Sequence, residues 1–126
     1  MSLYKQKNPL SQRISESIRV LSKYPSHVPV VVDCDPKLGK IKKNKFLVPR
    51  DVSASYLFQS IRKQLTCEAS TAIFIFCDDS LLCPTEMMTN IYDKYLDSKR
   101  NLKSGEEQDK FLYLMVQGEN TFGNKF

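Results

Sequence analysis

The chain has 126 residues, a formal net charge of +5 and 26% charged residues, which suits a single soluble domain with its own core. No run approaches the roughly 18 apolar residues of a membrane span. The first residues, MSLYKQKN, also lack the apolar segment of a signal peptide. The positive charge favours acidic proteins, anionic membrane surfaces or nucleic acid, without choosing among them.

The first half of the chain predicts a helix followed by two strands. Apolar residues recur at helical spacing after Pro9, and the helix is expected to end before the Tyr24–Pro25 pair. The segment VPVVVD then predicts a strand because it is rich in branched residues. After a basic turn, KFLVP predicts a second short strand that forms a hairpin with the first.

The second half alternates helix and strand. A helix is expected from about Ala54 to Leu65, followed by the nearly all-apolar strand AIFIFC. A short helix is expected after Pro84 and Thr85, then a polar loop over 96–109 and a last strand, FLYLMV. This order of elements is typical of an α+β roll with one sheet.

Catalytic and metal-binding patterns are weak. The cysteines show no C-x-x-C pairing, and with a single histidine in the chain a zinc site or disulfide framework is not predicted: Cys34, Cys67, Cys77 and Cys83. His27 carries no local catalytic signature, although a Cys–His pair can form in space. A phosphate-binding glycine loop is absent from the sequence. We expect no enzyme activity, no metal and no cofactor.

The strand in KKNKFLVPRD is apolar on both faces, because Phe46 and Val48 point one way and Leu47 the other. Pro49 ends it, and proline in sheets is confined largely to edges. Two interpretations remain open from the pattern: a strand covered by helices on both faces, which is the more common case, or an exposed edge that accepts a partner's strand.

Four segments carry a resemblance to a known family: YPSHVPVVVD, KFLVPRDV…IRKQL, AIFIF and KFLYLMVQGENTFG. In their order and spacing they resemble the autophagy-related protein 8 family, which includes the light chain 3 and GABA-receptor-associated protein types. The resemblance runs from about Tyr4 to Gly123. It implies a ubiquitin-like β-grasp with a four-stranded mixed sheet and two additional N-terminal helices. It also implies a division into an N-terminal helical extension (1–23), a ubiquitin-like domain (24–117) and a flexible C-terminal tail (118–126).

The resemblance gives the end of the chain a role. In this family a cysteine protease cleaves after a C-terminal glycine, here between Gly123 and Asn124. Activating and conjugating enzymes then join the glycine to phosphatidylethanolamine. Glycine suits this chemistry because it adopts extended conformations freely and leaves its carbonyl unhindered. The residues after Gly123 favour this lipid-conjugated branch over the protein-conjugated autophagy-related protein 12 type.

The resemblance also implies two pockets for a partner's aromatic-x-x-aliphatic motif, joined by pairing of the partner with the strand around Lys45 to Val48. The first takes the aromatic residue and corresponds to Glu16, Val20, Pro29, Val31, Lys45, Leu47 and Phe111. The second takes the aliphatic residue and corresponds to Phe46, Val48, Pro49, Val52 and Leu57.

The chain departs from the family pattern at several of these sites. Ser60 replaces an apolar residue of the second pocket, which is therefore expected to be shallower or more polar. His27 and Gln64 replace arginines that often meet acidic residues flanking the motif. We expect them to be flank contacts of weaker charge, and at His27 to respond to pH. The polar loop up to residue 110 is longer than usual in the family, which costs little entropy.

Together these features predict a non-catalytic ubiquitin-like modifier that acts in autophagosome formation and recruits cargo receptors. Its expected partners are the protease, the activating and conjugating enzymes, cargo receptors and the membrane through the lipid, with tubulin as a further candidate. Nucleic acid is not expected, and the protein is expected to be a cytoplasmic monomer that moves to autophagosomal membranes, and to the vacuole or lysosome. The alternatives are a protein-conjugated modifier and a basic tubulin- or RNA-binding module.

Overall fold

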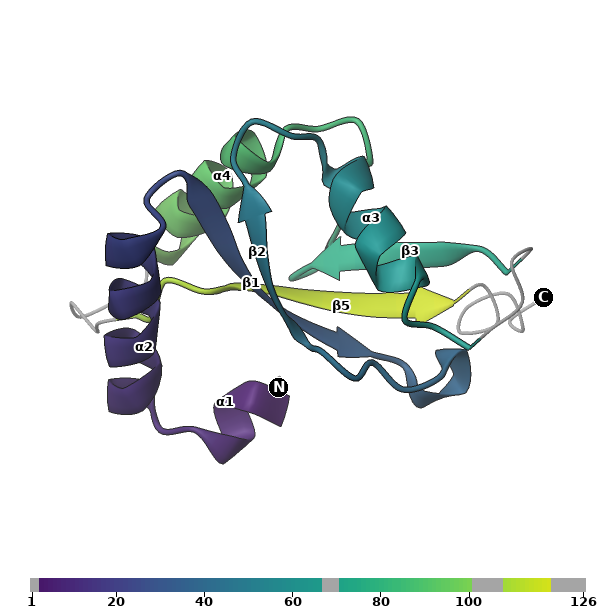
Figure 1. Cartoon of the computed structure of the whole chain (residues 1–126), viewed down its shortest axis with the longest axis horizontal. Helices are drawn as coiled ribbons and strands as arrows, with labels where there is room; N and C mark the ends of the chain where they lie inside the picture. Colours follow the sequence, from purple (N-terminus) through teal and green to yellow (C-terminus); the bar gives the residue numbers. More distant parts are fainter. Residues whose placement is uncertain (1–2, 67–70, 101–107, 119–126) are drawn as a thin grey trace.

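A five-stranded mixed sheet forms the centre of the molecule (Figure 1). The computed structural model describes residues 3–66, 71–100 and 108–118. The strands are β1 (His27–Cys34), β2 (Lys45–Pro49), β3 (Ile73–Cys77), β4 (Ser80–Leu81) and β5 (Leu112–Gly118). Their order is β2-β1-β5-β3-β4, with β1 and β5 parallel and the other neighbours antiparallel. Strand β2 therefore lies at one edge of the sheet.

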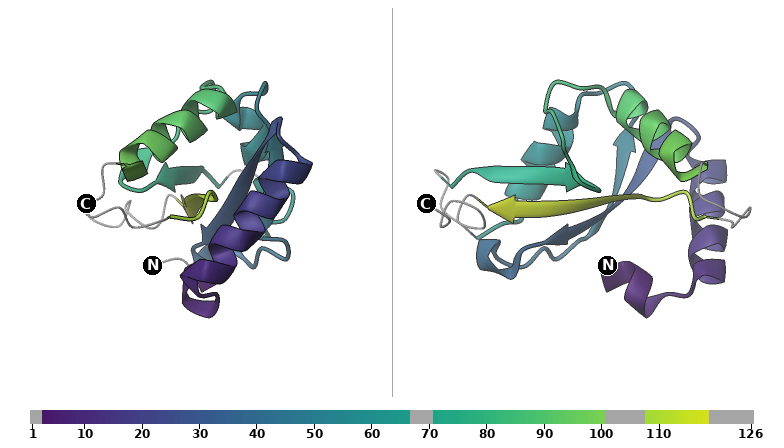
Figure 2. Two further views of the ribbon diagram at one scale, coloured as in Figure 1. Left: turned by 90° about the vertical axis from the view of Figure 1, so that its left-hand side faces the viewer. Right: turned by 180° about the vertical axis from the view of Figure 1, so that it is seen from behind.

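Helices cover both faces of this sheet (Figure 2). They are α1 (Leu3–Lys7), α2 (Leu10–Lys23), α3 (Ala54–Arg62) and α4 (Met88–Arg100), with a 3-10 turn, η1, at Pro36–Leu38. The side chains of β1 alternate between the two faces. Val28, Val30 and Val32 belong to the main core with α3 and α4, whereas Val31 belongs to a smaller cluster with α1. Strand β1 thus separates a large core from a small one.

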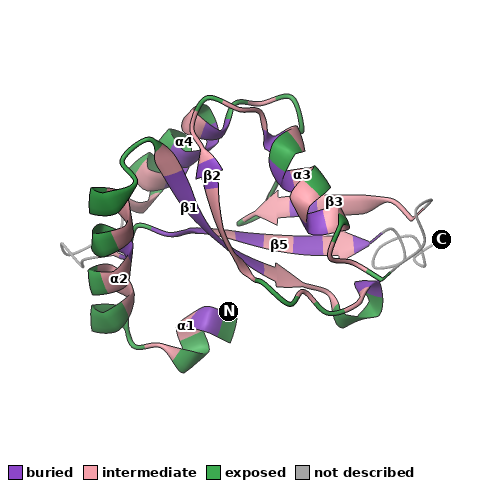
Figure 3. Ribbon diagram, viewed as in Figure 1, coloured by how far each residue is buried: buried purple, intermediate pink, exposed green. Residues whose placement is uncertain are grey.

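The main core is built from alternate residues of the strands and one side of each of α3 and α4. Leu57 and Ile61 of α3, together with Tyr92 of α4, are fully buried against the sheet. Figure 3 shows the buried parts of β1, β5 and α3 in purple. The smaller cluster contains Tyr4 and Phe111. It holds the N-terminal helices on the opposite face.

The predicted apolar stripe of α2 is only partly covered. Ser17 is the fully buried residue of this helix, while Ile18 is 50% exposed and Leu10 is 38% exposed. The hydroxyl of Ser17 accepts a hydrogen bond from the backbone N–H of Lys110 (3.0 Å). A small residue at the contact lets the helix backbone approach Lys110, which precedes β5, and the apolar stripe lies beside this contact.

Two details of the predicted elements were wrong. A two-residue strand, β4, makes the sheet five-stranded, and it pairs with β3 across a turn at which Asp78 adopts a positive φ of 53°. Helix α4 also continues to Arg100 through residues predicted to be loop. Lys99 in this extension lies over the ring of Tyr95 and pairs with Asp78 (3.2 Å), contacts that favour the helical conformation.

Two of the predicted domain boundaries can be compared with the ends of helices and strands. Helix α2 ends at Lys23, the end of the predicted N-terminal extension, and β5 includes Gly118, the first residue of the predicted tail. Gly118 is paired with Ile73 in the sheet. The division into 1–23, 24–117 and 118–126 remains a prediction.

Candidate functional site

The outer edge of β2 is available for pairing with another strand. Among the described strands β2 has one neighbour, β1. Val32 donates its N–H to the carbonyl of Asn44 (2.8 Å), and Pro29, which has no N–H, stands opposite Leu47. Since residue pairs in an antiparallel ladder alternate between bonded and unbonded, the backbone groups of Lys45 and Leu47 point away from β1. They present donors and acceptors along the edge of the sheet.

A hollow of about 190 Å³ adjoins this edge. All the residues predicted for the first pocket line it, apart from Val31, which is buried in the smaller cluster. Helix α2 supplies Glu16 and Val20, strands β1 and β2 supply most of the other residues, and Phe111 stands just before β5. The full lining is Glu16, Val20, Tyr24, Pro29, Val30, Lys43, Lys45, Phe46, Leu47 and Phe111. An apolar interior with charges at its rim suits an aromatic ring that carries a polar edge.

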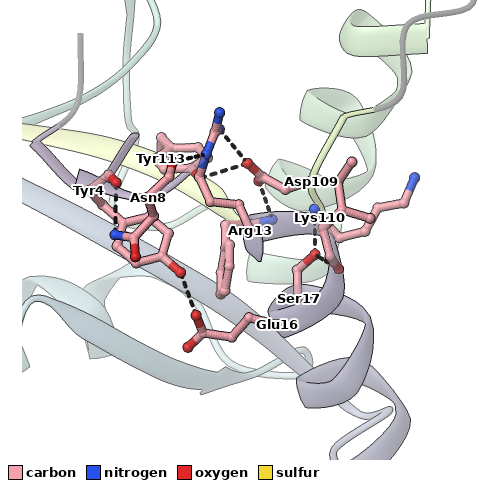
Figure 4. Close-up of polar contacts among 10 residues, drawn as sticks. Tyr4, Asn8, Arg13, Glu16, Ser17, Asp109, Lys110 and Tyr113 are labelled. Carbon is pink, nitrogen blue, oxygen red and sulfur yellow. Dashed lines mark hydrogen bonds and ion pairs between the residues drawn. The ribbon is translucent and has the colours of Figure 1, made fainter. Parts of the chain in front are cut away.

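Hydrogen bonds and an ion pair hold the polar groups at the rim, and Figure 4 shows the contact between Glu16 and Tyr4. Glu16 accepts a hydrogen bond from the Lys45 ammonium (2.8 Å) through Oε1 and one from the Tyr4 hydroxyl (2.5 Å) through Oε2. The hydrogen bond from Lys45, followed by that from Tyr4, lowers the pKa of the Glu16 carboxyl below its ordinary value. Glu16 is therefore a fixed carboxylate at neutral pH.

Phe111, one wall of the hollow, is held by a buried carboxylate. Asp109 accepts a hydrogen bond from the N–H of Phe111 (3.0 Å) and one from the Tyr113 hydroxyl (2.8 Å). Arg13 of α2 completes the network with an ion pair to Asp109 (2.8 Å), and both side chains are largely buried (Figure 4). Burial, and then the hydrogen bond to Asp109, raises the pKa of Tyr113. The network ties α2 to the residue that precedes β5.

Residues predicted for the second pocket lie around the other face of β2. Val48 and Leu57 are fully buried in the main core. Phe46 and Val52 are half-buried and pack against that core, and Pro49 is also half-buried. The hydroxyl of Ser60 donates to the carbonyl of Tyr56 (3.0 Å) within α3. An aliphatic side chain could reach Leu57 only after the covering side chains move.

The predicted flank contacts are engaged with other parts of the protein. His27 lies edge-on to Tyr24, with ring centroids 5.9 Å apart, and its Nδ1 is buried without a hydrogen-bond partner in the described part of the chain. Gln64 accepts a hydrogen bond from the N–H of Lys43 (2.9 Å) and donates one to the carbonyl of Lys43 (3.3 Å). Each therefore supports a residue that lines the hollow, and direct contact with a partner remains a prediction.

Several residues of the site were missed from the sequence. Tyr24 and Lys43 line the hollow, and Tyr4 reaches its rim from α1. Tyr24 ends a helix and Lys43 lies in a basic turn, so both could have been suspected from their closeness to the predicted residues. The contact of Tyr4 with Phe111 joins the two ends of the chain (ring centroids 5.5 Å) and has no local sequence signal.

A second, larger hollow of about 310 Å³ lies between the β3–β4 hairpin and α4. Its rim carries the Lys94–Glu86 ion pair (2.8 Å), and burial raises the pKa of its Cys77 thiol to about 11. None of the predicted site residues lines it. The smaller hollow is the better candidate because it adjoins the free edge of β2, whereas the larger one does not.

Other predicted features give less information. Within residues 3–66, 71–100 and 108–118 there is no cluster of metal-ligating side chains and no helix long and apolar enough to cross a membrane. Cys34, Cys77 and Cys83 form no disulfide with one another. Gly123 and Asn124, the predicted cleavage site, lie outside the described residues, as does Cys67.

Known proteins resemble the chain along almost its whole length. The family model "Autophagy protein Atg8 ubiquitin like" matches residues 12–123. Autophagy-related protein 8b of Arabidopsis thaliana is 37% identical over 98% of this chain and 94% of its own length. Autophagy-related protein 8 of Coccidioides immitis is 34% identical over 98% of each.

Solved structures agree with the fold. The crystal structure of Trypanosoma brucei ATG8 superposes with a TM-score of 0.79 at 28% identity, covering 94% of this chain and 96% of that one. Plasmodium falciparum Atg8, solved with a peptide of Plasmodium falciparum Atg3, gives a TM-score of 0.72 at 22% identity, covering 92% and 95%. The predicted ubiquitin-like α+β fold is confirmed, with the fifth strand as the difference. The chain belongs to the Atg8 family of ubiquitin-like autophagy proteins.

Proposed function

We propose that the β2 edge and the adjoining hollow bind linear peptides that carry an aromatic-x-x-aliphatic motif. The observation that carries this proposal is the free edge of β2 beside an apolar hollow with a charged rim. The peptide adds a strand to β2, and its backbone pairs with the outward groups of Lys45 and Leu47. Its aromatic side chain fills the hollow between α2 and β2. Main-chain pairing gives affinity, and the pockets select the sequence.

The aliphatic side chain of the motif falls on the opposite face, because neighbouring positions of a strand alternate. There it meets Phe46, Pro49 and Val52, with Val48 and Leu57 behind them. This second site opens on binding, since Val48 and Leu57 are buried in the free protein. Cargo receptors and components of the conjugation machinery are the partners that we expect to carry such motifs.

We also propose that the protein is a ubiquitin-like modifier and has no catalytic activity of its own. A cysteine protease removes residues 124–126, and activating and conjugating enzymes transfer the Gly123 carboxyl to phosphatidylethanolamine. The family match, which extends to residue 123, supports this assignment. The Atg3 peptide bound to the Plasmodium falciparum relative supports a conjugating enzyme as one partner. The lipid then holds the protein on autophagosomal membranes, and through them it reaches the vacuole or lysosome.

Substitution of Leu47 tests the peptide site. Leu47→Ala removes apolar surface between the hollow and the pairing edge, so affinity for an aromatic-x-x-aliphatic peptide is expected to fall by about 1–3 kcal/mol. Isothermal titration calorimetry measures the change, with circular dichroism to check the fold. Leu81→Ala is the matched control, because Leu81 is 58% exposed on β4 at the other edge of the sheet. Equal peptide affinity of the two folded variants would place the binding site on another surface.

A further inference from the structure

Tyr4 reaches the candidate hollow from outside the part of the chain that the family model covers. The model begins at residue 12, and Tyr4 belongs to α1 (Leu3–Lys7). Its hydroxyl donates to Glu16, and its ring packs edge-on against Phe111 with centroids 5.5 Å apart. The Lys45 ammonium lies 4.5 Å from the centre of the same ring. Three residues that line the hollow thus meet on one tyrosine.

Tyr4 is also the main attachment of α1. This helix has five residues, too few to be stable alone, and Tyr4 is its buried residue, 6% exposed. Two further contacts hold the same segment: the Lys5 ammonium lies over the ring of Tyr113 (4.2 Å), and Asn8 caps the carbonyl of Tyr4 (2.9 Å). The contacts that dock α1 are therefore largely the contacts that fix the rim of the hollow.

We propose that Tyr4 is a positioning residue for the peptide site, and that docking of α1 and binding of the peptide's aromatic residue favour one another. This inference rests on the proposed function. When α1 is docked, Tyr4 holds the Glu16 carboxylate and shields one side of Lys45. When α1 leaves, two long charged side chains become free at the mouth of the hollow.

The sign of the coupling follows from preorganisation. Glu16 and Lys45 have many rotamers, and ordering such side chains opposes binding unless it has already occurred. Phe111 likewise loses the Tyr4 ring that packs edge-on against it. The docked form of α1 is thus the form that binds peptide well, and by linkage bound peptide must stabilise the docked form to the same extent.

Tyr4→Phe separates the hydroxyl from the ring. Phenylalanine keeps the packing on Phe111 and removes the hydrogen bond to Glu16, so peptide affinity is expected to fall about three- to tenfold. Tyr56→Phe is the matched control, because Tyr56 is 49% exposed on α3, and its affinity should equal that of the unmodified protein.

A double-mutant cycle distinguishes positioning from general loosening of the fold. In a Glu16→Ala background Tyr4→Phe should change affinity less than about 1.5-fold, since its target is gone. A loss of the same size in both backgrounds, or no loss in either, would overturn the proposal.

Hydrogen exchange tests the reciprocal effect on the full chain. Saturating aromatic-x-x-aliphatic peptide should slow amide exchange over residues 4–8 several-fold, whereas the same peptide with alanine at the aromatic position should not. Unchanged or faster exchange with the motif peptide would overturn the coupling. Failure of the unmodified protein to bind either peptide would overturn the proposed function and the coupling together. If the Tyr4→Phe variant bound the motif peptide as tightly as the unmodified protein does, the coupling would be overturned and the proposed function would stand.

Discussion

The carboxylate of Glu16 lies between two donors, the hydroxyl of Tyr4 and the ammonium of Lys45. Each holds it from a different element, α1 and β2, while Glu16 itself stands on α2. A single charged residue therefore joins three segments of the chain at the rim of the hollow. Its ionisation state is accordingly a measure of whether those segments are in place.

The lowered pKa of Glu16 predicts how its contribution to stability depends on pH. The folded pKa lies below the unfolded value of about 4.3, so the contribution is present above that value and is lost as pH falls through the folded pKa. Urea denaturation of the protein and of Glu16→Gln should give a difference in unfolding free energy that is steady above about pH 5.5 and shrinks below about pH 4.

A difference that stays constant down to about pH 3 would mean that Glu16 gains nothing from its two partners. Near-ultraviolet circular dichroism at each pH would confirm that both proteins start from the folded state.

At the scale of elements, the helices α2 and α3 and the strands β1, β2, β3 and β5 were predicted from their patterns, whereas β4 was missed and α4 was predicted too short. Strand β4 has two residues, too few to show any alternation, and α4 extends through polar residues whose helical support comes from Asp78 across the sheet edge. Helix α1 was expected from the resemblance alone. In each case tertiary contact, which local sequence does not encode, decides the structure.

The residues of the candidate site also fall into those that were predicted and those that were not. Most residues that line the first hollow are ones that the resemblance named, whereas Tyr24 and Lys43 are not. The Asp109 network and the Tyr4 contact were not predicted, since they join positions about a hundred residues apart in sequence. The closed state of Leu57 also depends on packing that no motif records.

Helix α4 is tied to the entrance of β5 by one buried hydroxyl. Tyr92, 1% exposed, donates a hydrogen bond to the carbonyl of Lys110 (2.5 Å), next to Phe111. Tyr92→Phe leaves that carbonyl without its donor, and the free energy of unfolding should fall by about 1–3 kcal/mol. Thermal or urea denaturation measures the change.

Tyr56→Phe provides the comparison, because the same atom is removed from an exposed position and a change within about 0.5 kcal/mol is expected. If the two variants lose equal stability, the hydroxyl of Tyr92 does not secure α4 to the sheet.

At the scale of the whole molecule, different helices pack on the two faces of the sheet. One carries α3 and α4 over the main core, and the other carries α1 and α2 beside the candidate peptide site (Figure 2). Strand β5 runs between them and ends at Gly118, at the end of the sheet away from α2 (Figure 1). The proposed peptide site beside α2 therefore lies away from Gly118, the last described residue before the proposed attachment point.

Gly123→Ala tests the proposed attachment. The variant should fold normally, because the substitution lies beyond β5, yet it should stay unprocessed or unconjugated, since a side chain hinders attack at the carbonyl. Intact mass of the protein recovered from starved cells is the measurement. Asn124→Ala is the control, because cleavage leaves the same glycine at the end of the chain. A phospholipid-sized mass increase in the Gly123→Ala variant would contradict the assignment.

The parallel pairing of β1 with β5 has a mechanical consequence. A protein anchored through the end beyond β5 and loaded with cargo along β2 carries tension across the strands β2, β1 and β5. Where the pull acts along the strand axes, the backbone pairing of β1 with β5, from Val30–Leu112 to Cys34–Val116, is loaded in shear and resists as a group. If the hydrogen bonds between β1 and β5 were instead broken one at a time, the sheet would unfold at a lower force. The sheet can thus serve as a tether that keeps its cargo site folded under tension.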